Sequence, residues 1–429
     1  MRNEMKYKFS TYLLANTDGN GNIIVFNTLF HNSVCIKKEE SSIFFDLRKQ
    51  IIDTGDYLGP KHNIQQFLDE KIIITSYDLD IEHELKNRYD EVFKSKDELM
   101  LTLLPTQQCN FRCVYCYEQF KNIKMDENII DKICSLVEKF LNEYMCLHIC
   151  WFGGEPLLSL DVIDVLTKRI SDVCKKHKKP YYASMTTNGY LLDLNTFKFL
   201  QRQHVMQFQV TLDGDKYTHD NQRVLYGGKE TYDVILNNLL NIKNHIKTST
   251  IKIIIRINLA DKVDFNEIQK LIDLFADDDR FTINIQKIFA TENNQETTNE
   301  TYFSALNTCN TRKPEELIPE HTICYAAKKN TLVISADGSL GKCTVNFEDP
   351  KNQFGNILNC DLESFSLDSI EYCNAVHSDK ECIKCCIYPL CFGKQCPARS
   401  VQLCGDIIDK YKLIIKNYSS KAKLLSLEN

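Results

Sequence analysis

The sequence predicts an α/β fold in which six β/α units form a partial barrel, flanked by an N-terminal α+β module and a cysteine-rich C-terminal domain. Three observations lead to this prediction. Apolar strand-like runs alternate with amphipathic segments from residue 98 to about residue 290. Polar motifs directly follow the first four of these runs. The 19 cysteines are clustered, with three in one loop and seven between Cys373 and Cys404.

The N-terminal module, residues 1–95, contains no cysteine cluster. Strand-like segments 9–14 and 23–26 flank the turn TDGNGN, which predicts a hairpin, and a third strand is expected at 33–37. Helical spacing follows at 41–52 and 63–70, then an apolar run at 71–75. The charge-rich stretch 78–96 is predicted to be a solvated helical linker.

The barrel, residues 96–310, is predicted from six apolar runs with helices between most of them. The strands are expected at 99–104, 147–152, 181–186, 207–212, 251–257 and 282–289. Residues 127–145 and 232–246 place their apolar side chains on one stripe, and Asp264 with Glu267 resembles a capping box. Such repeating units require a parallel sheet with right-handed crossovers, as in TIM-like barrels.

Polar motifs follow four successive strands of the predicted barrel. They are a loop with Cys109, Cys113 and Cys116, then residues 153–156 (GGEP), 187–189 (TNG) and 213–214 (DG). The carboxyl ends of parallel strands meet at one end of such a barrel, where active sites are built from the loops. These motifs therefore predict one reaction centre.

The cysteine loop has the spacing C-x3-C-x2-C. Zinc sites usually take four ligands from two separated pairs, whereas a lone triplet indicates an iron–sulfur cluster with one open iron. Nineteen cysteines in a reducing compartment also indicate metal or redox chemistry rather than disulfides. Cys134, Cys146, Cys150 and Cys174 are predicted to be core residues instead.

The bulk composition excludes several classes of protein. The net charge of −6 provides no electrostatic footprint for nucleic acid, which disfavours a non-catalytic regulator of nucleic acid carrying iron–sulfur or zinc. No apolar run approaches membrane-spanning length, and residues 1–10 lack the apolar core of a signal peptide. A cytoplasmic protein without a membrane partner is expected.

The cysteine loop, with Tyr115 before its last cysteine, resembles the radical S-adenosylmethionine (SAM) enzymes. The resemblance implies a [4Fe-4S] cluster on the three cysteines and SAM chelated at the open iron, which is cleaved to a 5′-deoxyadenosyl radical. It places the methionine amino group at GGEP and implies a ribose contact near Thr211. The SAM-binding residues that it implies are Tyr115, Gly153, Gly154, Glu155, Pro156, Asn188, Thr211 and Arg256.

The segment TLDGDKYTHDNQR resembles the S-x-DG…HD..R segment of peptide- and protein-modifying members of that family. Thr211 stands where those proteins usually carry serine. Arg256, on an isoleucine-rich strand, is either a carboxylate partner or an arginine pointing out of the sheet edge. His219 either organises the loop or contacts substrate.

The C-terminal domain, residues 311–429, resembles the SPASM extension, which carries auxiliary iron–sulfur clusters. Cys324 and Cys343 fit C-x13-G-x4-C on a predicted hairpin, and Cys382, Cys385 and Cys391 fit C-x2-C-x5-C. Cys396 departs from the pattern by one residue, and a zinc ribbon is the alternative.

The resemblance implies two auxiliary [4Fe-4S] clusters, which with the SAM cluster makes three. One would be held by Cys382, Cys385, Cys391 and Cys404, and the other by Cys324, Cys343 and Cys396. The fourth site of the second is either open or filled by Cys309, Cys360, Cys373 or Cys386.

The implied enzyme is a peptide maturase that acts on a ribosomally made precursor with a leader and draws electrons from a flavodoxin- or ferredoxin-type donor. The N-terminal module resembles small winged-helix modules that bind leaders, or it is a cap on the barrel. A cysteine thioether crosslink is the expected product. Formylglycine generation in sulfatases and carbon–carbon (cyclophane-type) crosslinking are the alternatives. Thr344 stands where sulfatase-maturing enzymes carry aspartate.

Overall fold

The computed structural model describes residues 6–59, 62–75, 81–288, 297–309, 324–370, 372, 380–391, 402–416 and 423–425. The chain divides into two compact units. Unit 1 comprises Met1–Phe93, Lys313–Ala327 and Cys373–Asn429, and unit 2 comprises Lys94–Arg312 and Lys328–Tyr372. The division into three domains remains a prediction.

Unit 2 is built on an eight-stranded sheet with the order β13-β12-β10-β9-β8-β6-β14-β15. Its first six strands are β6 (Glu98–Leu103), β8 (Cys146–Trp151), β9 (Tyr181–Thr187), β10 (Val205–Thr211), β12 (Lys252–Leu259) and β13 (Phe281–Lys287). They are parallel, and all six predicted strands are confirmed within a few residues; residue 289 lies outside the described part. The mostly parallel order is consistent with a partial barrel.

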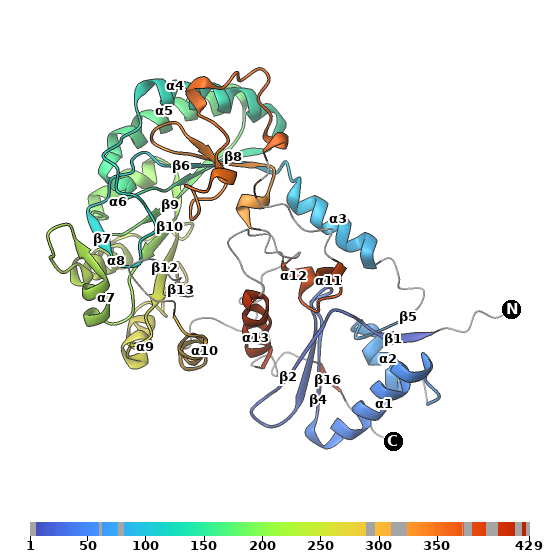
Figure 1. Cartoon of the computed structure of the whole chain (residues 1–429). Helices are drawn as coiled ribbons and strands as arrows, with labels where there is room; N and C mark the ends of the chain where they lie inside the picture. Colours follow the sequence, from blue (N-terminus) through green and yellow to red (C-terminus); the bar gives the residue numbers. More distant parts are fainter. Residues whose placement is uncertain are drawn as a thin grey trace. The chain divides into compact units, whose positions relative to one another are not determined.

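Helices follow most of these strands and cover one side of the sheet, as α4, α5 and α6 show in Figure 1. They are α4 (Glu127–Phe140), α5 (Leu160–His177), α6 (Leu194–Arg202), α7 (Lys216–Gln222), α8 (Tyr232–His245), α9 (Phe265–Asp273) and α10 (Asn299–Thr308). Asp264 caps α9 as predicted, since it accepts from Asn266 N at 2.8 Å. A capping box would also have Glu267 accept from the backbone N–H of Asp264, and this part of the prediction is wrong, because Glu267 accepts from Lys270 instead.

The two faces of the unit 2 sheet differ in chemistry. On β8, Leu147, Ile149 and Trp151 are buried in the core with residues of the helices. Alternate side chains of a strand point to opposite faces, so His148 and Cys150 lie on the other face. That face, the inner face, is only partly buried and largely polar, as Ser184, Thr186, Gln209, Asn284 and Gln286 also show.

A hairpin extends the sheet beyond β6. β14 (Thr331–Ile334) pairs in parallel with β6, and β15 (Leu340–Gly341) pairs antiparallel with β14. Gly338 lies in its turn at φ 81°, a conformation that favours glycine. The two strands of the predicted hairpin are confirmed, but Cys324 lies outside them, and the sequence did not predict the place of the hairpin beside β6.

Unit 1 contains a four-stranded sheet of order β16-β4-β3-β2 and a separate pair, β1 with β5. The elements are β1 (Tyr7–Phe9), β2 (Leu13–Thr17), β3 (Ile23–Asn27), β4 (Ser33–Ile36), α1 (Ser41–Thr54), α2 (His62–Asp69), β5 (Ile73–Thr75), α3 (Ile81–Phe93), α11 (Lys380–Ile383), α12 (Tyr388–Cys391), α13 (Gln402–Lys416) and β16 (Lys423–Leu425). The predicted β2–β3 hairpin and the helices that follow are confirmed. The 78–96 stretch is not fully solvated, because Leu85 and Tyr89 of α3 are buried.

Segments from both ends of the chain share the core of unit 1. Val25 and Val34 pack with residues of α1 and α2, whereas Phe26, on the opposite face of β3, packs with Ile414 and Ile415 of α13. The Thr28 hydroxyl donates to the Cys386 carbonyl at 2.5 Å, which ties the N-terminal sheet to the cysteine-rich segment. The winged-helix likeness of this module remains a prediction.

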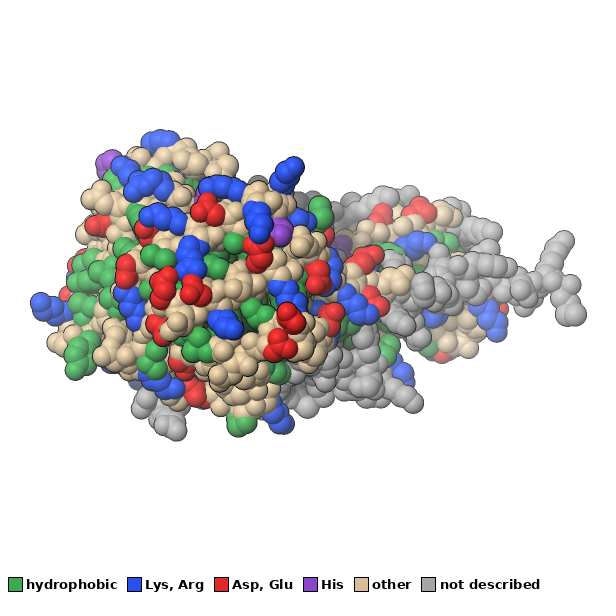
Figure 2. All heavy atoms as spheres, turned by 90° about the horizontal axis from the view of Figure 1, so that it is seen from above, with side chains coloured by type: hydrophobic (Ala, Val, Ile, Leu, Met, Phe, Trp, Pro, Cys, Tyr) green, Lys and Arg blue, Asp and Glu red, His purple; other side chains and the backbone are tan. Residues whose placement is uncertain are grey.

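The surface carries charges of both signs. Figure 2 shows Lys and Arg side chains interspersed with Asp and Glu over the described part of one face. Within the described residues, no helix has the length and hydropathy needed to cross a bilayer.

Candidate functional site

The cysteine loop begins where β6 ends, and its own side chains hold it in shape. The short strand β7 (Phe111–Cys113) pairs antiparallel with β11 (Arg223–Leu225), so that Cys113 lies opposite Arg223. Arg112 donates from Nη1 to the carbonyls of Cys109 and Phe111 at 2.8 and 2.6 Å. These bonds help to fix the conformation of the loop.

The three thiols of the loop are partly buried, which disfavours their ionised form. Burial, reinforced by the Glu155 carboxylate, raises the pKa of Cys109 to about 12, and burial raises the pKa of Cys116 to about 11. Thiolates in such surroundings need a cation, and iron supplies one. Among the described residues, no three Cys, His, Asp or Glu side chains are grouped to bind one metal ion. A cubane does not require such a group, because each thiolate ligates a different iron atom.

The two glycines after β8 let this loop and the cysteine loop touch. A Cβ on Gly154 would lie 2.2 Å from the Gln108 carbonyl oxygen, and one on Gly153, at φ 110°, would lie 2.5 Å from the Thr106 oxygen. Glu155 N donates to the Gln108 carbonyl at 2.8 Å. Pro156 then opens the short 3-10 helix Pro156–Ser159 that leads into α5. Any side chain at residue 154 would therefore push the cysteine loop away.

The Glu155 side chain is fully buried and ties β8 to the loop after β9. Its Oε1 accepts from Thr187 Oγ1 at 2.7 Å and from Leu157 N at 3.0 Å, and its Oε2 accepts from Asn188 N at 2.7 Å. Burial raises the pKa of Glu155, and these donors oppose the increase. The carboxylate therefore orders the loops, and a direct contact with a ligand ammonium group remains a prediction.

Asn188 reaches from the β9 loop to the cysteine loop. Its Nδ2 donates to Asn110 Oδ1 at 2.8 Å and lies 4.0 Å from Cys109 Sγ. Asn188, one of the residues predicted to bind SAM, is thus held beside the cysteine loop.

Tyr115 is the centre of a buried polar network. Its hydroxyl donates to Asp213 Oδ2 and accepts from Arg223 Nη1 at 2.8 Å and from Asn258 Nδ2 at 3.0 Å. Asp213 Oδ1 in turn accepts from Asn258 N at 2.7 Å. Arg256 donates to Asn258 Oδ1 at 2.8 Å and is half-buried, so it faces this end of the sheet. The network joins the cysteine loop to the ends of β10 and β12.

His219 organises the loop after β10. It is buried and neutral, because burial, with Arg223 nearby, lowers its pKa to about 2. Its Nδ1 accepts from Asp213 N at 3.0 Å, so Nε2 carries the proton and donates to Thr231 Oγ1 at 3.0 Å. Thr231 donates onward to the Arg223 carbonyl at 2.6 Å. Thr211, at the end of β10, lies opposite Arg256 in the sheet register.

The cysteines assigned to the auxiliary clusters are divided between the two units. Cys343 lies in unit 2 just after β15, and its N donates to Asn352 Oδ1 at 3.1 Å. Cys324, Cys382, Cys385 and Cys391 belong to unit 1. Cys396 and the side chain of Cys404 lie outside the described residues. Both auxiliary ligand sets therefore remain predictions.

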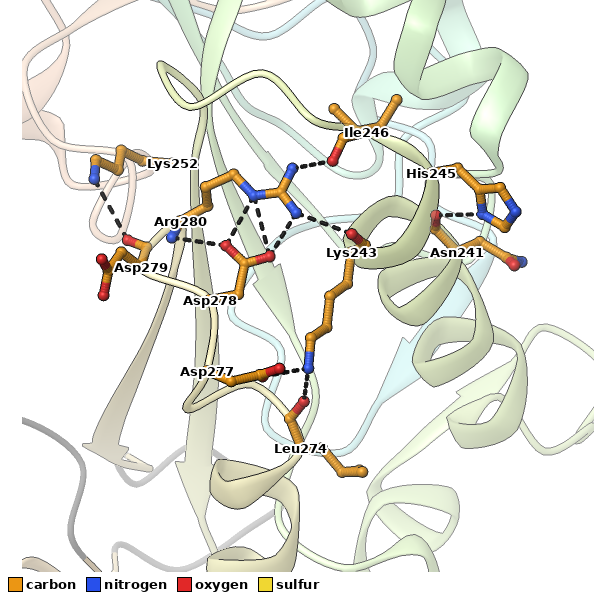
Figure 3. Close-up of polar contacts among 10 residues, drawn as sticks. All are labelled: Asn241, Lys243, His245, Ile246, Lys252, Leu274, Asp277, Asp278, Asp279 and Arg280. Carbon is orange, nitrogen blue, oxygen red and sulfur yellow. Dashed lines mark hydrogen bonds and ion pairs between the residues drawn. The ribbon is translucent and has the colours of Figure 1, made fainter.

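A hollow of about 500 Å³ lies at the opposite end of the sheet, beside the start of β13. Figure 3 shows two ion pairs in its lining, Asp278 with Arg280 and Lys243 with Asp277. Arg280 Nη2 also donates to the Lys243 carbonyl at the end of α8, at 3.0 Å. This arrangement stabilises a helix terminus and supplies no reactive group.

Sequence reasoning missed Asn258, which nothing in its isoleucine-rich strand distinguishes, and misplaced two cysteines. Cys134 and Cys174 are buried as predicted, but Cys146 and Cys150 are partly exposed on the inner face of β8. The alternation CLHICW, with polar residues at every second position, was the available signal.

Comparison with known proteins agrees with this geometry. The Radical SAM superfamily model matches residues 103–275. Fe-coproporphyrin III synthase of Methanosarcina barkeri is 27% identical over 173 residues, which is 40% of each chain. The radical SAM cyclopropyl synthase TigE of Paramaledivibacter caminithermalis is 24% identical over 260 residues, 49% of this chain and 54% of that protein. The chain thus spans about half the length of the curated relatives it matches.

Among solved structures, native anSMEcpe with bound AdoMet superimposes with a TM-score of 0.57 at 18% identity, covering 75% of this chain and 98% of that one. This likeness shows a shared fold. Members of the matched superfamily are enzymes that bind SAM at a [4Fe-4S] cluster. The matched range includes the cysteine loop, GGEP, TNG and the Asp213 loop, all described above. Residues 103–275 of this chain are therefore a radical SAM domain.

Proposed function

We propose that this protein is a radical SAM peptide maturase that abstracts hydrogen from a ribosomally made precursor peptide and installs a cysteine thioether. The observation that supports it most is the linkage of four strand-end loops at one end of the sheet. The cysteine loop is bonded to the GGEP loop through Glu155 N, to the TNG loop through Asn188, and to the Asp213 loop through Tyr115. Separate turns would not be connected in this way.

The residues present fit the cofactors of this family. Cys109, Cys113 and Cys116 would hold the [4Fe-4S] cluster, and the contact made by Gly153 and Gly154 keeps the GGEP loop against them. When bound, the cluster and SAM supply the one-electron chemistry that produces a 5′-deoxyadenosyl radical. Tyr115, Asn188 and the partly buried Arg256 would line the SAM site, while the protein orients the substrate and excludes water.

A peptide substrate is supported by the chemistry of the inner face. A peptide backbone carries a donor and an acceptor at nearly every residue, and these need partners once water is removed. Ser184, Thr186, Gln209, Asn284 and Gln286 present such groups on the inner face. A structure of anSMEcpe, which shares this fold, contains AdoMet and Cp18Cys peptide. The leader-binding role of residues 1–95, the thioether product and the flavodoxin- or ferredoxin-type donor belong to the same proposal.

The cofactor assignment is tested with the anaerobically reconstituted enzyme. Replacing Cys109, Cys113 and Cys116 with alanine should abolish 5′-deoxyadenosine formation on reduction with dithionite. Cys146→Ala, which removes a partly exposed cysteine outside the loop, should leave it unchanged. The wild-type protein with three cubanes should hold roughly twelve iron atoms. Zinc in place of iron, or cofactor cleavage by the triple variant, would refute the assignment.

The reaction is tested with a short cysteine-containing precursor peptide as the substrate. A thioether removes two hydrogens and abolishes alkylation of the peptide thiol. Carbon–carbon crosslinking removes two hydrogens but leaves the thiol reactive, and formylglycine creates a carbonyl that reacts with hydrazides. Cys382→Ala with Cys385→Ala should lose the product while cofactor cleavage survives. A normal yield from that variant would contradict the auxiliary clusters.

A further inference from the structure

The inner face of the sheet carries a second group of reactive side chains, contributed by β6, β8 and β9. They are Glu98, His148, Cys150, Tyr182 and Ser184. Cys150 lies opposite Ser184 in the sheet register, two residues along β8 from His148. Side chains two residues apart in a strand share a face, so this group is a consequence of strand pairing.

His148 contacts both a thiol and a carboxylate. Its Nε2 lies 3.4 Å from Cys150 Sγ and 2.9 Å from Ser184 Oγ, while its Nδ1 lies 3.5 Å from Glu98 Oε2. The Tyr182 ring stacks on the imidazole at a centroid distance of 4.4 Å, and its hydroxyl donates to the same Glu98 oxygen. The imidazole is therefore held in place from two sides.

The charges favour an imidazolium at this position. Burial lowers the pKa of His148, but its hydrogen bonds with Cys150 and Glu98 outweigh burial and raise the pKa to about 9. The bond from His148 lowers the pKa of Glu98 to about 2, and Lys328 acts in the same direction. Tyr182 and Cys146 are the other titratable groups nearby, and burial raises the pKa of both.

We propose that Cys150, His148 and Glu98 form a nucleophilic thiol site that takes soft electrophiles. A positively charged imidazole within hydrogen-bond distance stabilises a thiolate, and a carboxylate behind the imidazole maintains that charge. Ser184 Oγ, 3.3 Å from Cys150 Sγ, supplies a second donor to the sulfur. Nothing in the cysteine loop or its cofactors requires this arrangement.

The chemistry of this site is balanced without an added oxidant or reductant. The thiolate attacks an electron-poor carbon, a carbon–sulfur bond forms, and the leaving group departs with its electron pair. The proton lost from the thiol stays on His148 Nε2. Cys150 precedes Gly153 by three residues, roughly 10 Å along an extended chain.

Competitive alkylation of the native holoenzyme tests this site. Iodoacetamide at limiting concentration is followed by denaturation, trypsin digestion and mass spectrometry. Cys146 and Cys150 lie on one tryptic peptide, residues 140–168, and fragment ions between them show which is labelled. Cys146 is a matched control, since it is partly exposed on the same face of β8, but its Sγ donates to the Asp97 carbonyl at 3.2 Å rather than to a histidine.

At pH 7 we expect Cys150 to be labelled on the order of tenfold faster than Cys146, because an imidazole lies within hydrogen-bond distance of the Cys150 sulfur, whereas the Cys146 sulfur contacts a carbonyl. His148→Gln should abolish the preference, and Glu98→Gln should reduce it while the histidine remains. Equal labelling at pH 7, or a preference that persists in both variants, would overturn the proposal. Because unfolding would also equalise the two labelling rates, the variants are compared at a temperature at which calorimetry shows each of them to be folded.

Discussion

The buried Asp213–Arg223 pair permits a sharp prediction. Asp213 is fully buried, its Oδ2 lies 4.0 Å from Arg223 Nε, and the Arg223 side chain is only 6% exposed. Asp213→Asn keeps the volume of the side chain but removes its charge. The Arg223 guanidinium then stays buried without the Asp213 charge. The new amide nitrogen is a donor, yet both oxygens that it could replace accept from donors, Tyr115 Oη and Asn258 N.

The expected loss follows from that burial. Neutralising one member of a buried ion pair costs about 3–5 kcal/mol, because the remaining charge is uncompensated. For a domain of this size, such a loss lowers the Tm by roughly 6–20 °C. Arg223→Met should have a similar effect. The Asp213→Asn/Arg223→Met double variant should lose less than the sum of the single variants, because it leaves no isolated charge.

Differential scanning calorimetry of the reconstituted enzyme measures this effect. Asp172→Asn is the matched control, since it makes the same chemical change in a pair with Lys175 whose side chains are 77% exposed. Such a surface pair contributes about 0–1 kcal/mol. If Asp213→Asn melts within the range of Asp172→Asn, or if the double variant is strictly additive, the buried pair does not stabilise this region.

Two further predictions concern the cysteine loop and the inner face. Gly154→Ala should lower iron retention and reduce the free energy of unfolding by about 1–3 kcal/mol, because its Cβ would overlap the Gln108 carbonyl. Gly19→Ala is the control and should change neither quantity, since a Cβ there has no atom within 4 Å. Wild-type iron content in Gly154→Ala would contradict the close contact. The pKa of Glu98 is about 2 against an ordinary 4.5, so its contribution to stability is complete above pH 4.5 and is lost as the pH falls towards 2. The pKa of His148 is about 9 against an ordinary 6.5, so its contribution to stability is complete below pH 6.5 and is lost as the pH rises towards 9. Glu98→Gln should therefore lower the Tm most between pH 4.5 and 6.5, and a Tm difference that does not vary with pH would contradict the ion pair.

The sequence specified the strands and helices closely. Six predicted strands of the barrel occur within a few residues of their expected bounds, because buried strands in a parallel sheet are nearly continuous apolar runs. The positions of the motifs at strand ends also followed from the sequence, since a parallel sheet brings those ends together. Of the capping box predicted at Asp264, only the Asp264 cap is formed, because the Glu267 side chain binds Lys270 and not the start of its own helix.

The partners of each motif residue were decided only by the tertiary structure. Tyr115 binds Asp213 and Asn258, which lie 98 and 143 residues away in the chain. Cys150 has a polar neighbour, Ser184, because the register between β8 and β9 places the two residues opposite each other. Local periodicity records which residues are buried, since burial is set by the alternation of a single strand. It does not record which strands become neighbours, since that depends on the order in which crossovers add strands to the sheet. The amino-acid sequence thus determined the elements and the positions of the cysteine motifs, and the packing of distant segments determined which side chains surround those motifs.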